Sequence, residues 1–574
     1  MKKLINRPDQ VIPEMLEGFL ALYPDLARLS HHNVLLRSDA DQVREQQVAL
    51  ISGGGSGHEP AHGGYVGAGM LSAAVAGEVF TSPSADSVLA AIRAVSGRPG
   101  ALLIVKNYTG DRLNFGLAAE MARAEGVWVE TVVVADDVAL AGTEETAGRR
   151  GLAGTVLIHK IAGAAAAAGL DLPQVASLAQ AAADNVGTMG VSLSAGTVPA
   201  VGKVSFTLGE NEMELGLGIH GEPGVQRVPL ASADEVIDAL LKQIVSTLRL
   251  RPGERVVALL NNLGATTNME LAILARRVVF ALESYGFTLE RFYSGTLMSS
   301  LEMAGISLSL LRVDDERLKW LDAPTSAPAW PSSSGKATGA AQVLESAIAA
   351  VPKVQYPIQT QIGRTVRDAI LSACQALMGA EERLTELDRA VGDGDLGSNL
   401  ARAAKAGEAE LPFYPLDNPP ETLKALGVTL QETLGGSSGP LYGVLLLRTG
   451  MFLEGGPADY PQRWAAAVWE GCGAISELGG ARLGDRTMLD ALIPFAQTLR
   501  EGVAARRPVK DVLAAAVTAA ERGAEGSARL IPRRGRSSYL GERALGHADP
   551  GAVAVSIWLR AVVASLSAVS GTVI

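Results

Sequence analysis

Three aspartates lie close together in the C-terminal third of the chain. They are Asp388, Asp393 and Asp395, and the glycines between them favour a turn that brings the carboxylates together. Two such charges about 4 Å apart repel by roughly 4 kcal/mol at an effective dielectric near 20, and a divalent cation removes that repulsion. Oxygen ligands without histidine or cysteine favour Mg²⁺ or Ca²⁺ over zinc, and Gly397 breaks the EF-hand spacing. We predict a Mg²⁺ site shared with substrate phosphates; a solvated acidic turn is the alternative.

Glycine-rich segments recur after these aspartates and offer backbone N–H donors of the kind that a polyphosphate needs. They are residues 435–439, 479–480 with 484–485, and 546–551, and Arg536 is a candidate partner for phosphate charge. Each segment is a weak signal alone, because turns between helices are often glycine-rich. Together with the aspartates they point to a nucleotide.

Two histidines follow glycine-rich segments in the N-terminal part. His58 follows the sequence Ser-Gly-Gly-Gly-Ser-Gly, which we expect to form a loop after a strand at 48–51; no Lys-Ser or Lys-Thr follows, so it is not a Walker A loop. His220 ends the segment 212–220, in which apolar residues alternate with Glu214, Gly216 and Gly218. A strand of that period places His220 on a face where a small molecule could lie on the backbone. The alternative for each is a histidine with a structural role only.

The elements that must position these residues are of two kinds. Residues 1 to about 325 alternate short β-rich runs with helices, which is typical of α/β layers. Strands at 101–105 and 127–134 are followed by Lys106 and Asp111 with a helix at 114–124, and by Asp136. Ligands of open α/β sheets bind at the carboxyl ends of strands, and three loops leave strand ends in this half, carrying His58, Lys106 with Asp111, and Asp136.

The later part of the chain reads differently. A Pro/Ser-rich segment at 323–336 is followed by apolar residues at helical spacing, with few strand signals. We predict a multidomain chain of α/β plus all-α class. Its parts are a two-part α/β domain at 1–325 (about 1–185 and 186–325), a linker at 326–360 and an all-helical domain at 361–574.

Bulk properties exclude several classes of protein. The net charge of −11 over 574 residues leaves no broad basic field, so we expect no nucleic-acid partner. Cys374 and Cys472 are the only cysteines, which fits a reducing compartment. No signal peptide is recognisable, and the apolar segment 551–569 carries Arg560 midway, so we expect no membrane span. We therefore expect a soluble, cytoplasmic protein.

With these residues in place, the chain resembles the single-chain, ATP-dependent dihydroxyacetone (glycerone) kinases. The resemblance covers both domains and rests on seven motifs in order: Gly53-Gly-Gly-Ser-Gly-His-Glu-Pro60, Gly77-Glu-Val-Phe-Thr-Ser-Pro83, Lys106-Asn-Tyr-Thr-Gly-Asp111, Gly218-Ile-His-Gly-Glu-Pro223, Gly392-Asp-Gly-Asp395, Gly484-Asp-Arg-Thr-Met-Leu-Asp490 and Asp549-Pro-Gly551. Agreement at all seven by chance is negligible.

The resemblance implies a kinase, usually a homodimer, whose α/β domain holds a ketose and whose antiparallel helical barrel holds ATP with two Mg²⁺ ions. It implies that the histidine matching His220 adds to the substrate carbonyl as a hemiaminal, with Asp111 and His58 also catalytic. The residues implied to hold the substrate are Gly55, Ser56, Gly57, His58, Lys106 and Asp111, and those implied to bind metal are Asp388, Asp393 and Asp395. The implied nucleotide contacts are Leu396, Gly397, Ser398, Asn399, Ser437, Ser438, Gly479, Met488, Arg536, Asp549, Pro550 and Gly551.

The implied chemistry agrees with the residue types. Neutral imidazole is a competent nucleophile toward a ketone, and glycerol, which lacks a carbonyl, would be excluded. Asp111 beside His58 would accept or orient the proton of the attacking hydroxyl. The sequence departs from the family pattern at Leu396, where many relatives have histidine, and at Arg486, where many have lysine. These departures bear on nucleotide affinity more than on activity.

Other functions share much of this set of residues. A kinase for another short ketose or aldose, such as erythrulose or glyceraldehyde, or a lyase that cyclises the FMN moiety, would use the same sites. A kinase rephosphorylated by a phosphotransferase-system protein is disfavoured, because both domains are in one chain. The non-enzymatic alternative is a ketose-sensing regulator, which leaves the three aspartates unexplained.

Overall fold

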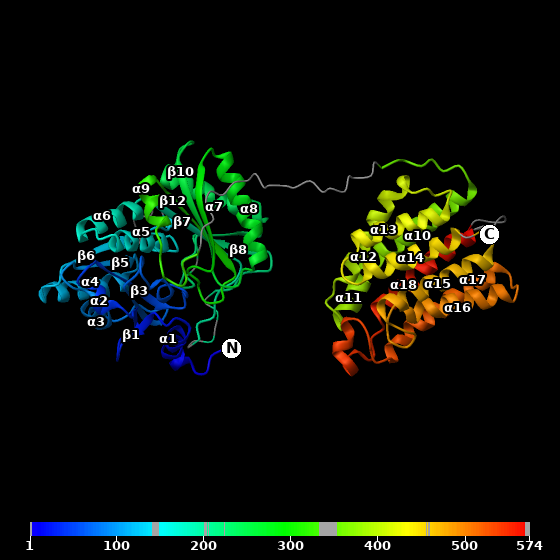
Figure 1. Ribbon diagram of the computed structural model, residues 1–574, viewed down its shortest axis with the longest axis horizontal. Coiled ribbons are helices and arrows are strands. Elements are labelled where there is room, and N and C mark those ends of the chain that lie inside the picture. Colours follow the sequence, from blue (N-terminus) through cyan, green and yellow to red (C-terminus); the bar gives the residue numbers. More distant parts are fainter. Residues whose placement is uncertain are drawn as a thin grey trace. The chain divides into compact units, whose positions relative to one another are not determined.

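The computed structural model describes residues 3–140, 148–199, 202, 204, 206–222, 224–331, 353–454, 456 and 460–568. The chain separates into two compact units, Met1–Leu344 and Glu345–Ile574, which we describe one at a time. Most of the predicted linker, residues 332–352, lies outside the described residues. The first unit contains two sheets with helices and the second is helical, so the predicted fold class is confirmed (Figure 1).

The first sheet provides the edge on which half of the candidate site is built. Its strand order is β1 (Leu26–Arg28), β2 (Val34–Arg37), β4 (Ala73–Val79), β3 (Ala49–Ser56), β5 (Ala101–Lys106) and β6 (Val129–Val134). Strands β3 to β6 run parallel, and β1 and β2 are antiparallel additions. Strands β3 and β5 are buried along their whole length, as expected for parallel strands covered on both faces.

Helices cover both faces of this sheet. Helices α3 (Ala85–Val95) and α4 (Thr109–Ala124) pack on one face, and α5 (Thr155–Ala167) and α6 (Leu172–Ala183) pack on the other. Helix α1 (Val11–Leu22) packs against β1 and β4, and the short α2 (Ala40–Val43) lies beside α3. The Ala-rich helix α5 is buried on all sides, so its small side chains serve close packing.

The second sheet has the order β11 (Thr288–Gly295), β10 (Arg255–Asn262), β12 (Gly305–Arg312), β7 (Val186–Ser192), β8 (Glu212–Leu215) and β9 (Gln226–Pro229). Only β10 and β11 pair in parallel. Helices α7 (Ala233–Leu248) and α8 (Asn268–Ser284) cover one face and begin at capping boxes, while α9 (Asp315–Asp322) packs on α5. Both sheets lie in the same compact unit, Met1–Leu344.

The structure corrects three expectations about element bounds. Strand β3 continues through the glycines to Ser56, so the predicted loop begins only at Gly57. Helix α4 begins at Thr109, which places Asp111 in its first turn. The strand expected to reach His220 ends at Leu215, because Gly216 has a φ of 68° and turns the backbone out of the sheet. His220 therefore lies on a loop.

The second unit is a ring of helices. They are α10 (Gln361–Gly379), α11 (Glu381–Val391), α12 (Leu396–Glu410), α13 (Pro419–Thr433), α14 (Ser438–Glu454), α15 (Pro461–Gly479), α16 (Leu489–Ala504), α17 (Val509–Gly526) and α18 (Pro550–Ala568). Most consecutive helices pack side by side, and α10 packs on α18, which closes the ring. The ring encloses an apolar cavity of about 1020 Å³. The aspartates Asp388, Asp393 and Asp395 are not among the residues that line it.

Helix α18 is long and apolar enough to cross a membrane by length and composition. In this structure it packs against α10, α16 and α17 and contributes to the core of the helical unit.

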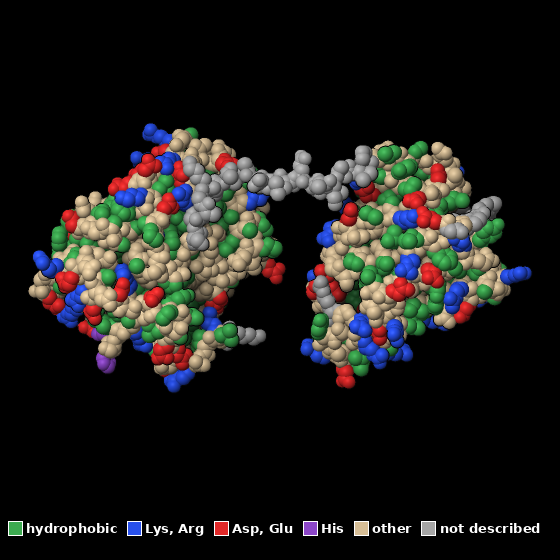
Figure 2. Space-filling view, viewed as in Figure 1, with side chains coloured by type: hydrophobic (Ala, Val, Ile, Leu, Met, Phe, Trp, Pro, Cys, Tyr) green, Lys and Arg blue, Asp and Glu red, His purple; other side chains and the backbone are tan. Residues whose placement is uncertain are grey.

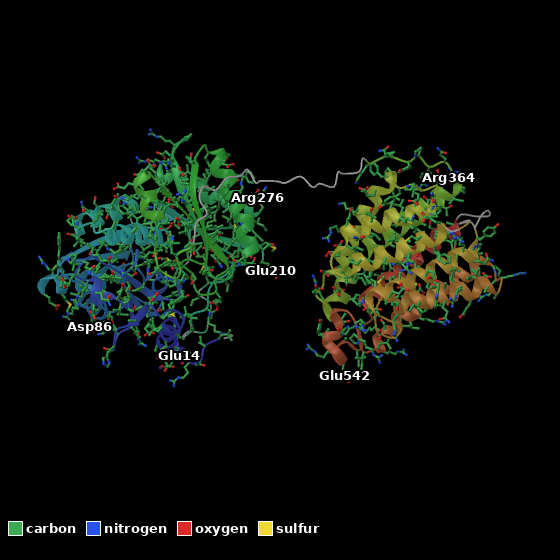
Figure 3. All side chains as sticks on the ribbon, viewed as in Figure 1. Glu14, Asp86, Glu210, Arg276, Arg364 and Glu542 are labelled. Carbon is green, nitrogen blue, oxygen red and sulfur yellow. The ribbon has the colours of Figure 1, made fainter. Side chains whose placement is uncertain are left out.

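On the surface, basic and acidic side chains are interspersed over the visible face of both units (Figure 2). Charged residues such as Glu14, Asp86 and Arg364 lie at the periphery of their units (Figure 3).

Candidate active site

Strands β3 and β5 bring a lysine and an aspartate together beneath the glycines of β3. Lys106 is the last residue of β5, and its Nζ lies 3.7 Å from Oδ2 of Asp111; both side chains are buried. Asp111 also accepts a hydrogen bond from the hydroxyl of Ser82. A Cβ at position 54 would collide with Nζ of Lys106, so Gly54 makes room for the ammonium group. Lys106 and Asp111, which the sequence places after the same strand, therefore form a buried pair.

His58 presents one ring nitrogen without a protein partner. Its Nδ1 lies 2.9 Å from the carbonyl oxygen of Ser299, so Nδ1 must carry the hydrogen. Its Nε2 is buried and has no hydrogen-bond partner among the described residues. Burial, with the nearby His220 and Lys106, holds the pKa of His58 well below its usual value. The imidazole is therefore neutral, with a free lone pair on Nε2.

His220 reaches the same place from the second sheet. It lies on the loop after β8, and its ring centroid is 4.5 Å from that of Tyr108, 4.8 Å from that of His58 and 5.4 Å from that of Phe80. Burial, with the positive charges of Lys106 and Arg150, lowers the pKa of His220 to about 3. His220 is therefore an unprotonated imidazole at neutral pH, as a nucleophile must be.

Two other predicted substrate residues already have partners within the protein. The hydroxyl of Ser56 donates to the carbonyl of Gly77 at 2.7 Å, and the N–H of Gly57 donates to the carboxylate of Glu59 at 3.0 Å and 3.1 Å. Gly55 lies in β3, where a Cβ would clash with the backbone at Phe80 and Thr81. These residues therefore shape the site by close backbone packing.

Sequence reasoning missed several residues that surround the site. Tyr108 has a buried hydroxyl without a partner among the described residues. His62 lies with its Nε2 3.1 Å from Nζ of Lys106 and its Nδ1 3.0 Å from Nε2 of His159, so a chain of two imidazoles leads away from the lysine. Tyr108 stands inside a motif that the sequence analysis singled out, whereas His159 lies in an Ala-rich helix that signals only packing.

In the helical unit the three predicted metal ligands come together. Asp388 lies in the last turn of α11, and Asp393 and Asp395 lie between α11 and α12. One carboxylate oxygen from each lies within 4.8 Å of the others. Asp388 accepts a hydrogen bond from the N–H of Leu396 at 3.2 Å, and Gly394 has a φ of 77°, which allows the turn. An all-carboxylate donor set of this kind fits Mg²⁺ or Ca²⁺.

The predicted nucleotide residues lie at the ends of helices. They are Leu396 to Asn399 at the start of α12, Ser437 and Ser438 at the start of α14, Gly479 at the end of α15, Met488 just before α16, and Asp549 to Gly551 at the start of α18. Several of these ends adjoin: a Cβ on Gly551 would lie 3.7 Å from that of Met488. Helix N-termini present N–H groups and a positive dipole end, which suit phosphate. The side chain of Arg536 and the motif residue Pro223 lie outside the described residues.

A second layer of charges lies next to the aspartate cluster. Burial and the charges of Asp490 and Asp388 raise the pKa of Asp549 to about 6 against the attraction of Arg486. Asp490 accepts hydrogen bonds from the N–H groups of Gly484 at 2.6 Å and Thr487 at 2.7 Å, and so fixes the loop before Met488. This role of Asp490 was missed, although its motif was noticed.

Comparisons with known proteins agree with this arrangement. A Dak1 domain family model matches residues 17–329, and a DAK2 domain family model matches residues 390–564. The chain is 46% identical to "Triokinase/FMN cyclase" of Homo sapiens over 98% of each chain, and 44% identical to "Putative 3,4-dihydroxy-2-butanone kinase" of Solanum lycopersicum over 98% of this chain and 97% of the relative.

A solved structure is similar along the whole chain. The dihydroxyacetone kinase from C. freundii in complex with AMP-PNP and Mg²⁺ has a TM-score of 0.64 and 35% sequence identity, and the match covers 98% of this chain and 99% of that one. The Dak1 and DAK2 family models also match this one chain in the order of its two units. The chain belongs to the dihydroxyacetone kinase family.

Proposed function

We propose that this chain phosphorylates dihydroxyacetone with ATP, and that His220 holds the ketose covalently. The observation that carries the proposal is the pair of neutral imidazoles: His220 and His58 meet at a ring distance of 4.8 Å beside the buried pair of Lys106 and Asp111. A site built to bind a neutral carbonyl compound and activate its hydroxyl needs a nucleophile and a base of this kind.

Capture of the ketone follows from the protonation state of His220. A nitrogen lone pair of the imidazole bonds to the carbonyl carbon, and the π electrons of the C=O bond move to oxygen. The ring N–H proton is lost from the other nitrogen, and a proton is gained by the former carbonyl oxygen, so the neutral hemiaminal has the composition of ketone plus histidine. Glycerol has no carbonyl and would form no such bond.

Activation of the hydroxyl falls to His58 and Asp111. His58 offers a free lone pair on Nε2, which a substrate hydroxyl can use as acceptor, and a buried acceptor without a partner costs about 1 to 3 kcal/mol until a ligand satisfies it. Asp111 and Lys106 would orient the remaining hydroxyl, because one offers an acceptor and the other a donor. The proton lost on phosphorylation would pass to His58 or Asp111.

The helical unit would hold the nucleotide. Asp388, Asp393 and Asp395 would bind two Mg²⁺ ions, and the helix N-termini at Leu396, Ser438 and Pro550 would face the phosphates. The C. freundii kinase with AMP-PNP and Mg²⁺ supports this assignment. Bound Mg-ATP would supply the phosphoryl group and neutralise charge during its transfer.

The experiment is an ADP-release assay with ATP, Mg²⁺ and four acceptors: dihydroxyacetone, glyceraldehyde, erythrulose and glycerol. We expect release with dihydroxyacetone but not with glycerol, and loss of release in His220→Ala. Equal turnover of glycerol, or a His220→Ala variant with normal activity, would contradict the covalent mechanism. Faster turnover of erythrulose would leave the mechanism standing and change the substrate.

The name of the human relative makes cyclisation of an FMN-containing nucleotide a second candidate activity. Such a reaction would need the helical unit and its metal site but not the nucleophile His220. An assay of FAD cleavage in the His220→Ala variant therefore separates the two activities. A purely sensory role remains disfavoured, because the aspartate cluster has no part in ketose binding.

We further propose that the protein is a homodimer in the cytoplasm. Both cysteines are buried and free, which fits a reducing compartment. Mass measurement in solution tests the dimer.

A further inference from the structure

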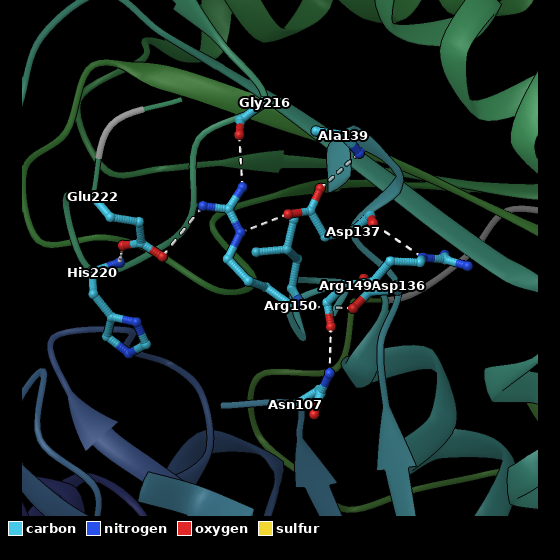
Figure 4. Close-up of polar contacts among 10 residues, drawn as sticks. Asn107, Asp136, Asp137, Ala139, Arg149, Arg150, Gly216, His220 and Glu222 are labelled. Atoms are coloured by element: carbon cyan, nitrogen blue, oxygen red, sulfur yellow. Dashed lines mark hydrogen bonds and ion pairs between the residues drawn. The ribbon is translucent and has the colours of Figure 1, made fainter. Parts of the chain in front are cut away.

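One arginine outside the predicted site connects the two sheets where His220 lies. Arg150 donates from Nε to Oδ2 of Asp137 at 2.6 Å and from Nη2 to the carbonyl oxygen of Gly216 at 2.6 Å (Figure 4). Its Nη1 lies 3.5 Å from Oε1 of Glu222. Asp137 follows β6 of the first sheet, whereas Gly216 and Glu222 flank His220 on the loop after β8 of the second. All three guanidinium nitrogens are thus used.

Glu222 in turn binds the backbone of His220. Its Oε2 accepts a hydrogen bond from the backbone N–H of His220 at 2.8 Å, as the dashed line in Figure 4 shows. A side chain at Gly218 would overlap the Glu222 carboxylate and lie 2.9 Å from Nη1 of Arg150, so only glycine leaves room for this contact. On the other side of the peptide, the hydroxyl of Ser300 donates to the carbonyl of Ile219 at 2.6 Å. The backbone at His220 is therefore held on both sides.

The Arg150 anchor is itself firmly held. The side chain of Asp137 is fully buried, and that of Arg150 is 13% exposed. Asp137 also accepts from the N–H of Ala139 at 2.9 Å, and its own N–H donates to the carbonyl of Arg150 at 3.0 Å. A planar guanidinium that is anchored through Nε on a buried carboxylate loses little freedom when its other nitrogens bind further groups. Arg150 can therefore impose a position on the His220 loop.

We propose that Arg150, acting through Glu222, is a positioning residue of the ketose site, which sets where the imidazole of His220 stands against His58 and Tyr108. The inference rests on the proposed role of His220 as the nucleophile. A shift of about 1 Å in a reacting group can reduce a rate by about 100-fold, so the loss of this anchor reaches the chemistry without any contact to substrate.

Arg150 also balances charge around the imidazole. Among the described residues, the charged or titratable groups next to His220 are His58, Lys106, Tyr108, Arg150 and Glu222, with Asp111 behind Lys106 and Asp137 behind Arg150. Arg150 pairs with both Glu222 and Asp137. Without Arg150, an unopposed carboxylate two residues away would favour the imidazolium form, which is not a nucleophile.

The test compares Arg150→Met, Arg150→Lys and Glu222→Gln in the full chain with Arg277→Met as matched control. Arg277 makes a bidentate pair with Asp238 between α8 and α7, remote from the His220 loop. We expect Arg150→Met to lower kcat/KM for dihydroxyacetone by about 100-fold with an unchanged KM for ATP. Arg150→Lys should recover part of that loss, Glu222→Gln should lose about tenfold, and Arg277→Met should match the wild type.

A purely structural role for Arg150 predicts something different. Arg150→Met would then lower the melting temperature while its kcat/KM stayed within about threefold of the wild type, and that result overturns the proposal. If Arg150→Met does not fold, Arg150→Lys and Glu222→Gln decide the question by the same criterion. Normal kcat/KM in both of these variants would also overturn it.

A readout independent of turnover separates this inference from the proposed reaction. The imidazole signals of isotope-labelled histidine, with His220 assigned from a His220→Asn variant, are followed between pH 3.5 and 8, because the pKa of the wild-type His220 lies at about 3. We expect the wild-type His220 to stay unprotonated and the signal in Arg150→Met to titrate at least about one pH unit higher. If the wild type fails to phosphorylate any ketose, the proposed function falls, while an unshifted His220 signal in Arg150→Met overturns the positioning role.

Discussion

The two halves of the candidate machinery differ in how complete the protein alone leaves them. In the α/β unit, His58, Lys106 and Asp111 are buried and all but a few of their polar atoms have protein partners. In the helical unit, Asp393 and Asp395 are exposed and lie close to Asp388 with like charge. The first half is organised in advance for a small uncharged molecule. The second half gathers three carboxylates near its surface, a donor set that fits a cation.

This difference fits the ligands that we propose for the two halves. A ketose has no charge to offset desolvation, so the site must supply neutral groups in fixed positions, and burial keeps both imidazoles unprotonated. A nucleotide brings phosphates and metal ions, so helix N-termini and carboxylates at the surface suffice. We therefore expect substitutions of the buried charged groups in the first half to cost stability as well as activity, and substitutions of the aspartates in the second to cost activity alone.

The largest expected effect is on activity in the helical unit. Replacing Asp393 and Asp395 together by alanine should reduce ATP-dependent turnover by at least about 1000-fold, because phosphoryl transfer depends on the metal ions. The melting temperature in the absence of Mg²⁺ should change little, because both side chains are exposed. Steady-state kinetics and thermal unfolding measure both.

The control for this variant replaces the exposed Glu382 and Glu386 of the neighbouring helix α11 with alanine, which should leave turnover unchanged. Near-normal turnover in the double aspartate variant would contradict the metal site. A large loss of stability would contradict the contrast between the two halves.

For Lys106 in the α/β unit, we expect a large loss of stability. Lys106→Met removes a buried cation and leaves Asp111 buried, with the Ser82 hydroxyl as its remaining side-chain partner among the described residues. Breaking a buried pair in this way costs about 3 to 5 kcal/mol of unfolding free energy, in addition to the loss of ketose binding. Urea unfolding measures the difference.

A surface pair provides the comparison. Arg93 binds Glu125 with a side chain that is 53% exposed, and Arg93→Met should change the free energy of unfolding little, because solvent screens exposed ion pairs. Equal costs for the Lys106 and Arg93 variants would show that burial does not distinguish the two halves.

The sequence predicted the site in the helical unit better than the site in the α/β unit. The aspartate cluster is local in sequence, so spacing and glycine content were enough to predict that Asp388, Asp393 and Asp395 come together, as they do. The meeting of His58 and His220 depends on contact between two sheets, and no local period encodes it; only the resemblance implied it. The strand expected to carry His220 ends at Leu215, because the backbone turns at Gly216. The prediction was too long because the alternation of apolar residues continues past this turn.

Residues that act through others were the hardest to find. Arg150, His62 and His159 carry no spacing signal, since each is recognised only by the group that it faces, and Glu222 stands in a noticed motif that does not show its role. The contacts between His62, Lys106 and His159, and between Arg150 and the His220 loop, join distant parts of the chain, so the fold had to be known first.

A moderate effect is expected for Asp549, which departs from the pattern because it is a buried carboxyl group in the helical unit. Its pKa in the folded state, about 6, lies above its usual value, so the folded state binds the proton more tightly than the unfolded state. The free energy of unfolding therefore falls as the pH rises from about 4 to about 6, by at most about 3 kcal/mol, and stays lower above pH 6.

Asp549→Asn should remove this penalty. Asparagine cannot ionise but can still accept the hydrogen bond that the N–H of Ala552 donates at 2.8 Å. After the lost attraction to Arg486, we expect a gain of about 1 to 2 kcal/mol at pH 7.5 without Mg²⁺, and no gain at pH 4. Urea unfolding at both pH values measures it, and a gain that is equal at the two values would refute the assignment.

The smallest effect is expected at Arg486, one of the two departures from the family pattern. Its side chain is buried with a φ of 60°, and it donates from Nη2 to the carbonyls of Ala544 and His547, whereas Nε and Nη1 have no partner among the described residues. Arg486→Lys removes the two unsatisfied nitrogens but keeps the charge near Asp549. The free energy of unfolding should therefore change by less than about 1 kcal/mol, toward greater stability. The KM for ATP should stay within about threefold of the wild type, because the charge is retained. A loss of more than tenfold in ATP affinity would instead show that the free guanidinium nitrogens serve the nucleotide, and that the helical half is as organised in advance as the α/β half.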